Sequence, residues 1–319
     1  LECADLLERI AFNVIPAACF EDCSAVQDIL LVNQIEASNT RFLPRGESEF
    51  SNAYLTKKLS HGAVSVLSAF PLYMQAACMV KDDELNFLTY TPCEMDVSVG
   101  GCKIMLSERT GYPFRNTVVF KVEYADGEPE VKINFRVPKN VTMQLISGGQ
   151  VVATGSKEIT VKCVLRTGST FMLKMDIPMT VEENADGTFS LLKGNLLMAL
   201  KVPHTMTIDE ADRRVVRLNF AKKWNIAPLL SRRMRGGTRG LYEDETTIVH
   251  NITSTPFSLD NPPFELRVRS KNVLNWDYDV DGFTEIPRKP LFSEEALERT
   301  FIPFGCSLLH MAQFPKCLR

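Results

Sequence analysis

The chain has 319 residues, of which 45% are hydrophobic and 24% are charged. This balance is typical of a globular protein and excludes a mainly disordered one, because enough apolar surface is available to offset the loss of chain entropy. The formal net charge is −3, so the overall charge does not predict a nucleic-acid partner.

The first part of the chain is predicted to be helical. Six apolar residues recur at helical spacing between Leu6 and Ile15, and Pro16 is expected to end or kink this helix. The helical pattern begins at once and the first residue is not methionine, so we expect the chain to be the C-terminal portion of something longer. A second short helix is predicted over residues 19–31, and a loop over residues 33–52.

Helix is predicted again over residues 60–79, with a bend at Pro71. The longest uncharged apolar stretch, Gly62 to Val80, lies in this segment. It contains serines, a proline and a glutamine, and a membrane span needs roughly 20 strongly apolar residues. A buried helix is therefore favoured over a membrane span.

From residue 85 onward the pattern changes to short segments with many β-branched or alternating apolar residues, which is typical of a β-sandwich or barrel. Asp126-Gly127 and Asp186-Gly187 are predicted hairpin turns. An irregular basic insertion is expected near residues 205–250. Strands are predicted over residues 85–90, 102–106, 117–124, 131–137, 142–145, 158–165, 170–177, 189–202 (two strands broken at Lys193-Gly194), 264–270 and 300–314.

The usual catalytic and cofactor motifs are not found in the sequence. The nine cysteines include no C-x-x-C pair, and the four histidines are scattered. Cys19 and Cys23 stand four residues apart, but a zinc site would need further ligands. The basic segment from Arg213 to Arg239 is either a patch for an anionic partner or a solvated loop, and we favour the loop. No catalytic residue and no metal ligand is predicted from these patterns.

Nine short segments in a fixed order carry a family resemblance. Asp5-Leu-Leu-Glu-Arg-Ile-Ala-Phe-Asn13, Glu108-Arg-Thr-Gly-Tyr-Pro-Phe114 and Phe135-Arg-Val-Pro138 are three of them. Together the nine resemble the β-L-arabinofuranosidase-like enzymes of glycoside hydrolase family 127 (GH127). The other segments are residues 89–94 (TYTPCE), 177–179 (IPM), 193–200 (KGNLLMAL), 224–227 (WNIA), Pro262-Pro263 with Trp276, and 301–315 (FIPFGCSLLHMAQFP).

The resemblance implies an α+β chain that is mainly β. Residues 1–84 would be the C-terminal helices of an incomplete α/α-barrel catalytic domain, and residues 85–319 an antiparallel β-sandwich region. Complete family members are expected to be retaining exo-glycosidases that release L-arabinofuranose, with a zinc-held cysteine thiolate as nucleophile and a glutamate as acid/base. Zinc keeps a thiol deprotonated, and a protonated carboxyl group can supply the proton for the leaving group.

The sequence departs from the family at the residues that carry this chemistry. The family's Glu-Thr-Cys motif precedes the first helix, and this chain begins after it. Where the family has adjacent cysteines, this chain has residues 49–54 (EFSNAY). No cofactor is therefore expected in this chain, and zinc only in complete members. Asn33 and Gln34 match a family Asn-Gln pair near the barrel mouth, so they are predicted sugar contacts; the alternative is a polar pair that caps a loop.

The sequence therefore predicts a glycoside hydrolase-like protein that is inactive as this chain, because the zinc–thiolate site is not present. The alternative is a non-catalytic β-sandwich module that binds carbohydrate or protein. Carbohydrate is the expected partner in the first case, and neither nucleic acid nor a membrane span is expected.

Overall fold

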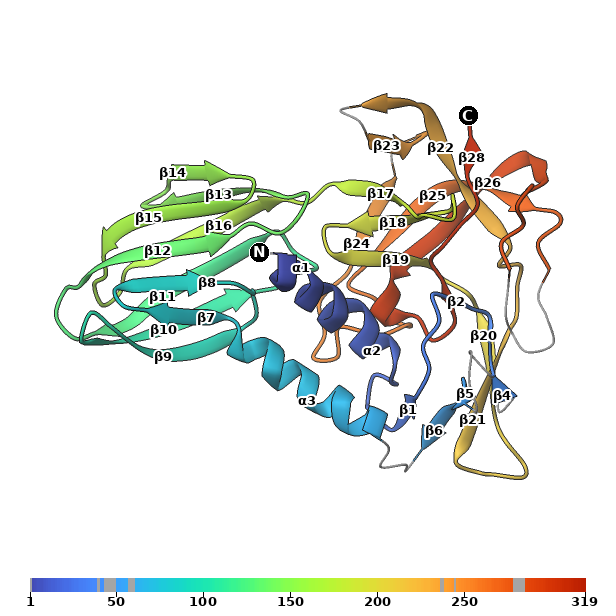
Figure 1. The fold of residues 1–319 in the computed structure, drawn as a ribbon, viewed down its shortest axis with the longest axis horizontal. Coiled ribbons are helices and arrows are strands. Elements are labelled where there is room, and N and C mark those ends of the chain that lie inside the picture. Colours follow the sequence, from blue (N-terminus) through green and yellow to red (C-terminus); the bar gives the residue numbers. More distant parts are fainter. Residues whose placement is uncertain are drawn as a thin grey trace. The chain divides into compact units, whose positions relative to one another are not determined.

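A computed structural model describes residues 2–38, 41–42, 50–56, 61–235, 238–243, 245–277 and 285–319 (Figure 1). They form two compact units. The first unit comprises residues 1–11 and 69–178, and the second comprises residues 12–68 and 179–319.

The first unit contains a β-sandwich of two sheets. One sheet has the order β14-β13-β16-β11-β10-β9, and the other has the order β15-β12-β8-β7, in which only β8 and β12 are parallel neighbours. The strands are β7 (Cys78–Lys81), β8 (Glu84–Phe87), β9 (Cys93–Val99), β10 (Cys102–Thr110), β11 (Thr117–Ala125), β12 (Glu130–Arg136), β13 (Thr142–Ser147), β14 (Gln150–Gly155), β15 (Glu158–Val164) and β16 (Thr170–Asp176).

Phenylalanines from both sheets meet in the core of this sandwich. Phe87 of one sheet and Phe120 of the other lie 4.6 Å apart between ring centroids, and Phe135 and Phe171 lie 5.7 Å apart. Strand β11 shows the predicted alternation over most of its length, because Val118, Phe120 and Val122 are buried while the residues between them are not. The predicted strands between residues 85 and 177 are confirmed, with ends shifted by a few residues.

The second unit is also mainly β. Its largest sheet has the order β17-β18-β19-β26-β25-β22-β23, with β24 beside β25 and β28 beside β22. The second sheet has the order β1-β6-β21-β20, with β3 beside β21, and two further pairs are β2-β27 and β4-β5. The strands are β1 (Ala25–Gln27), β2 (Asn33–Gln34), β3 (Glu36–Ala37), β4 (Arg41–Phe42), β5 (Phe50–Ser51), β6 (Tyr54–Thr56), β17 (Met179–Glu183), β18 (Phe189–Lys193), β19 (Leu196–Leu200), β20 (His204–Ile208), β21 (Val215–Phe220), β22 (Ile226–Arg235), β23 (Thr238–Leu241), β24 (Thr246–Val249), β25 (Phe264–Val273), β26 (Phe292–Pro303), β27 (His310–Met311) and β28 (Cys317–Leu318).

One of the two predicted hairpin turns is confirmed. Asp186-Gly187 joins the antiparallel strands β17 and β18, and Gly187 has the positive φ of 85° that such a turn favours. The hairpin predicted at Asp126-Gly127 is wrong, because β11 and β12 belong to different sheets. Gly127 also has a positive φ, of 75°. The same turn residues therefore serve a crossover between sheets, and a local pattern cannot distinguish it from a hairpin.

The fragment of an α/α barrel predicted over residues 1–84 is not seen among the described residues. One helical segment runs through α1 (Glu2–Arg9), a π-turn (Ile10–Val14) and α2 (Ile15–Ala17), and the other is α3 (His61–Gln75). No helix in the described ranges is both long and apolar enough to cross a membrane.

The chain between these helices forms short strands instead. In place of the helix predicted over residues 19–31, the chain reverses at Cys23, whose φ is +58°, and β1 then pairs with β6. A short apolar run does not by itself distinguish a helix from a strand, and this turn decides for the strand. The segment expected to be irregular near residues 205–250 contains the strands β20 to β24.

Candidate functional site

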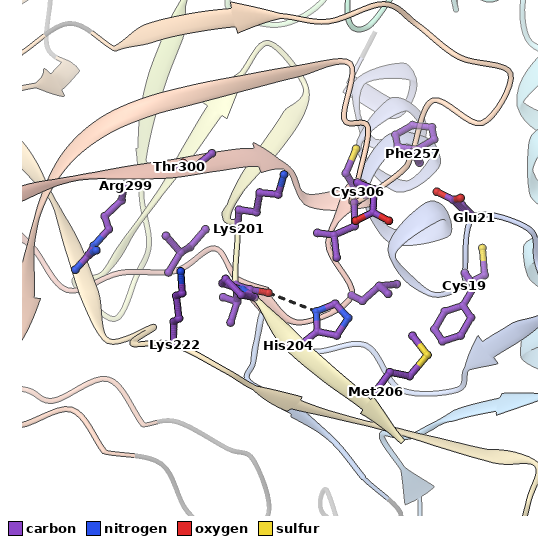
Figure 2. A pocket seen from close by; sticks show the side chains of 18 of the residues that line it. Cys19, Glu21, Lys201, His204, Met206, Lys222, Phe257, Arg299, Thr300 and Cys306 are labelled. Carbon is purple, nitrogen blue, oxygen red and sulfur yellow. Dashed lines mark hydrogen bonds between the residues drawn. The ribbon is translucent and has the colours of Figure 1, made fainter. Parts of the chain in front are cut away.

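A cavity in the second unit has a volume of about 960 Å³ (Figure 2). It is lined by residues of the turn before β1, the connection from β19 to β20, the end of β26 and the 3-10 turn Phe304–Cys306 that follows β26. Its polar lining includes Cys19, Glu21, Lys201, His204, Arg299 and Cys306.

Pairing between β19 and β26 places several of these residues. Leu200 lies opposite Phe301, and the backbone N–H of Lys201 donates to the carbonyl of Thr300 at 2.9 Å. Gly305, in the turn after β26, also lines the cavity. A Cβ at Gly305 would lie 2.5 Å from Cγ of Pro16, so only glycine lets this turn approach the end of the first helical segment so closely.

Three basic side chains of the cavity have different surroundings. The ammonium group of Lys201 lies 2.8 Å from Oε1 of Glu265. Arg299 donates to Oδ1 of Asn272 at 2.9 Å, while its buried Nε has no hydrogen-bond partner among the described residues. Burial lowers the pKa of His204, and a backbone contact to Val202 and the nearby Asp260 oppose this shift. The imidazole of His204 is therefore neutral at pH 7.

The two thiols of the cavity are poor nucleophiles. Burial, together with Cys23 and Asp22, raises the pKa of Cys19 to about 12, and its Sγ donates to the carbonyl of Ile15 at 3.7 Å. Burial also raises the pKa of Cys306, whose Sγ donates to the carbonyl of Pro256. Both thiols are protonated at neutral pH, and the thiolate is the reactive form of cysteine. Within the described part of the chain, no three His, Cys, Asp or Glu residues are grouped as a metal site.

The predicted sugar contacts Asn33 and Gln34 lie outside this cavity, in β2. Oδ1 of Asn33 accepts the backbone N–H groups of Ala312 and Gln313, both at 3.0 Å. Gln34 is fully buried, and its Nε2 lies 3.4 Å from the carbonyl of Asn52. Asn33 also lines a second hollow, of about 630 Å³, with Asp186. Contact between these two residues and a sugar stays a prediction.

Residues from four of the resembling segments meet inside the first unit. The guanidinium of Arg136 forms ion pairs with Asp5, at 2.7 Å, and with Glu8. The hydroxyl of Tyr112 donates to Oε2 of Glu8 at 2.8 Å, and that of Tyr90 donates to the carbonyl of Arg136 at 2.5 Å. Glu8 and Arg136 are both buried. We call this group the Arg136 cluster, and it joins the first helix to the sandwich.

Glu108, from the same segment as Tyr112, is a second buried acid. Its Oε1 accepts the backbone N–H of Thr91 at 2.9 Å, and its buried Oε2 has no partner among the described residues. Burial raises the pKa of Glu108 from its ordinary value of 4.5 to about 8. This carboxyl group is therefore mostly protonated at neutral pH.

The resembling segments of the second unit make similar structural contacts. Asn13 donates to the carbonyl of Asn195 at 2.9 Å and accepts the backbone N–H of Leu197 at 2.8 Å. The rings of Trp224 and Trp276 pack edge to face, 5.2 Å apart. These contacts show that the segments hold the fold together.

Comparisons with known proteins find similar solved structures but no matching family model or curated sequence. A solved structure of a GH127 β-arabinofuranosidase is similar, with 16% identity and a TM-score of 0.61 over 98% of this chain and 45% of that one. The chain has the fold of part of a GH127 protein.

Two further solved structures agree. A glycoside hydrolase has 14% identity and a TM-score of 0.66, covering 98% of this chain and 48% of its own. Ara127N-Se, a GH127 β-L-arabinofuranosidase from Geobacillus stearothermophilus T6, has 14% identity and a TM-score of 0.60. The match covers 99% of this chain and 46% of that one. The GH127-like chain thus spans about half the length of the structures it resembles. At such low identity the likeness concerns the fold, and activity needs its own evidence.

The sequence predicted little of the cavity in this GH127-like chain. Lys222 and Lys223 belong to the basic segment already noted, and both line the cavity. Lys201 and Arg299 carry no motif signal, because single basic residues are common. Lys201 directly follows β19 and Arg299 lies in β26, so only the pairing of these two strands brings them together.

Proposed function

We propose that this chain is a glycoside hydrolase-like protein related to β-L-arabinofuranosidases and that it does not hydrolyse glycosides by itself. The observation that carries the proposal is the structural likeness to GH127 proteins over nearly the whole chain. Two features support the absence of hydrolysis: the sequence has no adjacent cysteines, and both cavity thiols are protonated at neutral pH. We also propose that residues 1–84 derive from the end of a catalytic domain and residues 85–319 from the β region that follows it.

A hydrolysis assay tests this proposal. The purified chain is incubated with an aryl β-L-arabinofuranoside, zinc and a reductant, and release of the aryl group is followed by absorbance. We expect no turnover above that of buffer, because a protonated thiol is a weak nucleophile. Turnover that purifies with the chain and disappears with a chelator would contradict the proposal.

A second function is favoured by the chemistry of the cavity: non-catalytic binding of carbohydrate. Ligand sites are concave, of about 300–1,000 Å³, and combine apolar walls with a few polar groups that fix orientation. The cavity has this size and combines Phe20, Phe257 and Met206 with charged groups at its rim. Carboxylates such as that of Glu21 can accept hydrogen bonds from sugar hydroxyls.

Filling the cavity tests this second function. Met206 of β20 lines the cavity and is half exposed, so Met206→Trp should reduce the open volume without disturbing the core. We expect wild-type protein to bind arabinotriose in a calorimetric titration and Met206→Trp to lose at least about tenfold in affinity, because the ring would exclude the ligand. Ile208→Trp is the control, since Ile208 lies on the same strand, is also exposed and does not line the cavity. Equal binding by both variants would locate the sugar elsewhere.

A further inference from the structure

The charged side chains of the cavity are separated along its length. Figure 2 shows Arg299 and Lys222 at one end, Glu21 and Cys19 at the other, and His204 between them. Because burial lowers the pKa of His204, this imidazole is neutral at pH 7 and adds no positive charge between the two ends. The cavity therefore offers positive charge at one end and a carboxylate at the other.

The positive charge at the basic end is only partly neutralised by the protein. Lys201 is paired with Glu265. Lys222 and Lys223 form no ion pair with any residue that the structure describes, and the hydrogen bond that Arg299 makes to Asn272 is to a neutral amide. A buried N–H without a partner is costly, and Nε of Arg299 is such a group. An anionic oxygen at this end could pair with Arg299, Lys222 and Lys223, which form no ion pair with the residues that the structure describes.

Four acidic side chains also line the cavity, and two of them, Glu298 and Asp260, lie outside the turn before β1. Oε1 of Glu298 lies 3.8 Å from a guanidinium nitrogen of Arg267. Asp260 lies close enough to His204 for its charge to oppose the fall in the pKa of that imidazole. Glu21 and Asp22 belong to the turn before β1, and Figure 2 places Glu21 away from Arg299. An anion at the basic end would thus be far from Glu21, while hydroxyl groups could donate to the carboxylates of the turn.

We propose that the cavity binds an acidic carbohydrate, with the carboxylate of a uronic acid residue at Arg299, Lys222 and Lys223 and the hydroxyls of a neighbouring sugar at Glu21 and Asp22. This inference rests on the proposed binding of carbohydrate and specifies its class. A guanidinium and two ammonium groups suit a carboxylate, because charge-assisted hydrogen bonds are stronger than neutral ones. The volume of about 960 Å³ is far larger than a single small anion needs, which favours a sugar over a bare ion.

Calorimetric titration of the full chain with two trisaccharides of the same length tests the proposal. We expect tri-galacturonic acid to bind at least about tenfold more tightly than arabinotriose at low salt. The preference should shrink as salt rises, because ions screen exposed charges. Lys222→Gln should weaken binding of the acid about threefold and Arg299→Gln about tenfold, while arabinotriose binding stays within twofold.

Matched controls separate this inference from general charge effects. Lys316→Gln also removes one positive charge in the second unit, but Lys316 pairs with Glu183 outside the cavity, so the affinity for the acid should stay within about twofold. Lys222 is exposed, so its variant remains informative if Arg299→Gln fails to fold. Displacement of the acid by inorganic phosphate at equal concentration would overturn the assignment, because a bare anion would then suffice.

The outcomes also distinguish this inference from the proposed binding function. If arabinotriose binds and the acid binds no better, the cavity binds neutral carbohydrate and the inference is wrong. The same holds if the preference for acid survives both Lys222→Gln and Arg299→Gln. If neither trisaccharide binds, carbohydrate binding and this inference are both wrong.

Discussion

Replacing Arg136 with methionine is expected to lower the free energy of unfolding by about 3–5 kcal/mol, because it leaves buried Glu8 without its cationic partner. The guanidinium of Arg136 also donates through Nε to the carbonyl of Leu88 at 2.5 Å, and this hydrogen bond would be lost as well. Urea unfolding followed by far-UV circular dichroism measures the change. Fluorescence is less suitable, since both tryptophans, Trp224 and Trp276, lie in the second unit.

Two further variants show whether the buried charge is the cause. The double variant Glu8→Gln with Arg136→Met removes both charges, so it should recover part of the lost stability. Lys162→Met removes an ion pair to Glu130 in which both side chains are exposed, and it should leave the unfolding midpoint unchanged. An unfolding midpoint of Arg136→Met equal to that of wild type would show that the Arg136 cluster does not hold the first helix to the sandwich.

Glu108 is expected to make the protein less stable as the pH rises. The pKa of this carboxyl group is about 8 in the folded protein and near its ordinary value of 4.5 in the unfolded chain. Between these two values the folded state holds a proton that the unfolded state has released, so stability falls with increasing pH. The full effect is up to about 5 kcal/mol, is absent below pH 4.5, and stays constant above pH 8.

The variant Glu108→Gln keeps the shape of the side chain and removes the ionisation. Its free energy of unfolding should match that of wild type near pH 4 and exceed it by several kcal/mol at pH 8.5, as measured by urea unfolding at a series of pH values. Glu123→Gln is the contrasting control, because Lys121 lowers the pKa of Glu123 and no gain at high pH is expected. Parallel stability curves for wild type and Glu108→Gln would show that Glu108 ionises normally in the folded protein.

The local patterns of the sequence predicted much of the β structure. Alternating burial in β11 follows from alternating side chains, and the turn at Asp186-Gly187 follows from the positive φ that glycine adopts easily. The same kind of evidence failed for residues 19–31. There, one turn at Cys23 and pairing with β6 decided between helix and strand. Pairing with a distant strand leaves no local pattern.

The candidate site was predicted far less well than the fold. Asn33 and Gln34 were selected from a resemblance. In the structure, Asn33 accepts backbone N–H groups next to β27, and Gln34 contacts the carbonyl of Asn52. The cavity instead depends on Lys201, Lys222 and Arg299, which come from different strands and connections. Lys201 and Arg299 are isolated basic residues, and such residues are usually solvated surface groups, so no pattern could select them in advance. Lys222 belongs to the basic segment from Arg213 to Arg239, for which a solvated loop was favoured over a patch for an anionic partner.

The sequence alone thus showed that this chain is a globular, mainly β protein, through its 45% of hydrophobic residues, its net charge and its alternating segments. The tertiary structure decided what the resembling segments do. Glu8, Tyr112 and Arg136 are more than a hundred residues apart at their extremes, yet they share one buried cluster. The tertiary structure also decided where the charged side chains of the cavity lie. The physical reason is that periodicity and turn chemistry act between neighbours in the chain, whereas burial of charge and the meeting of strands depend on residues far apart in sequence.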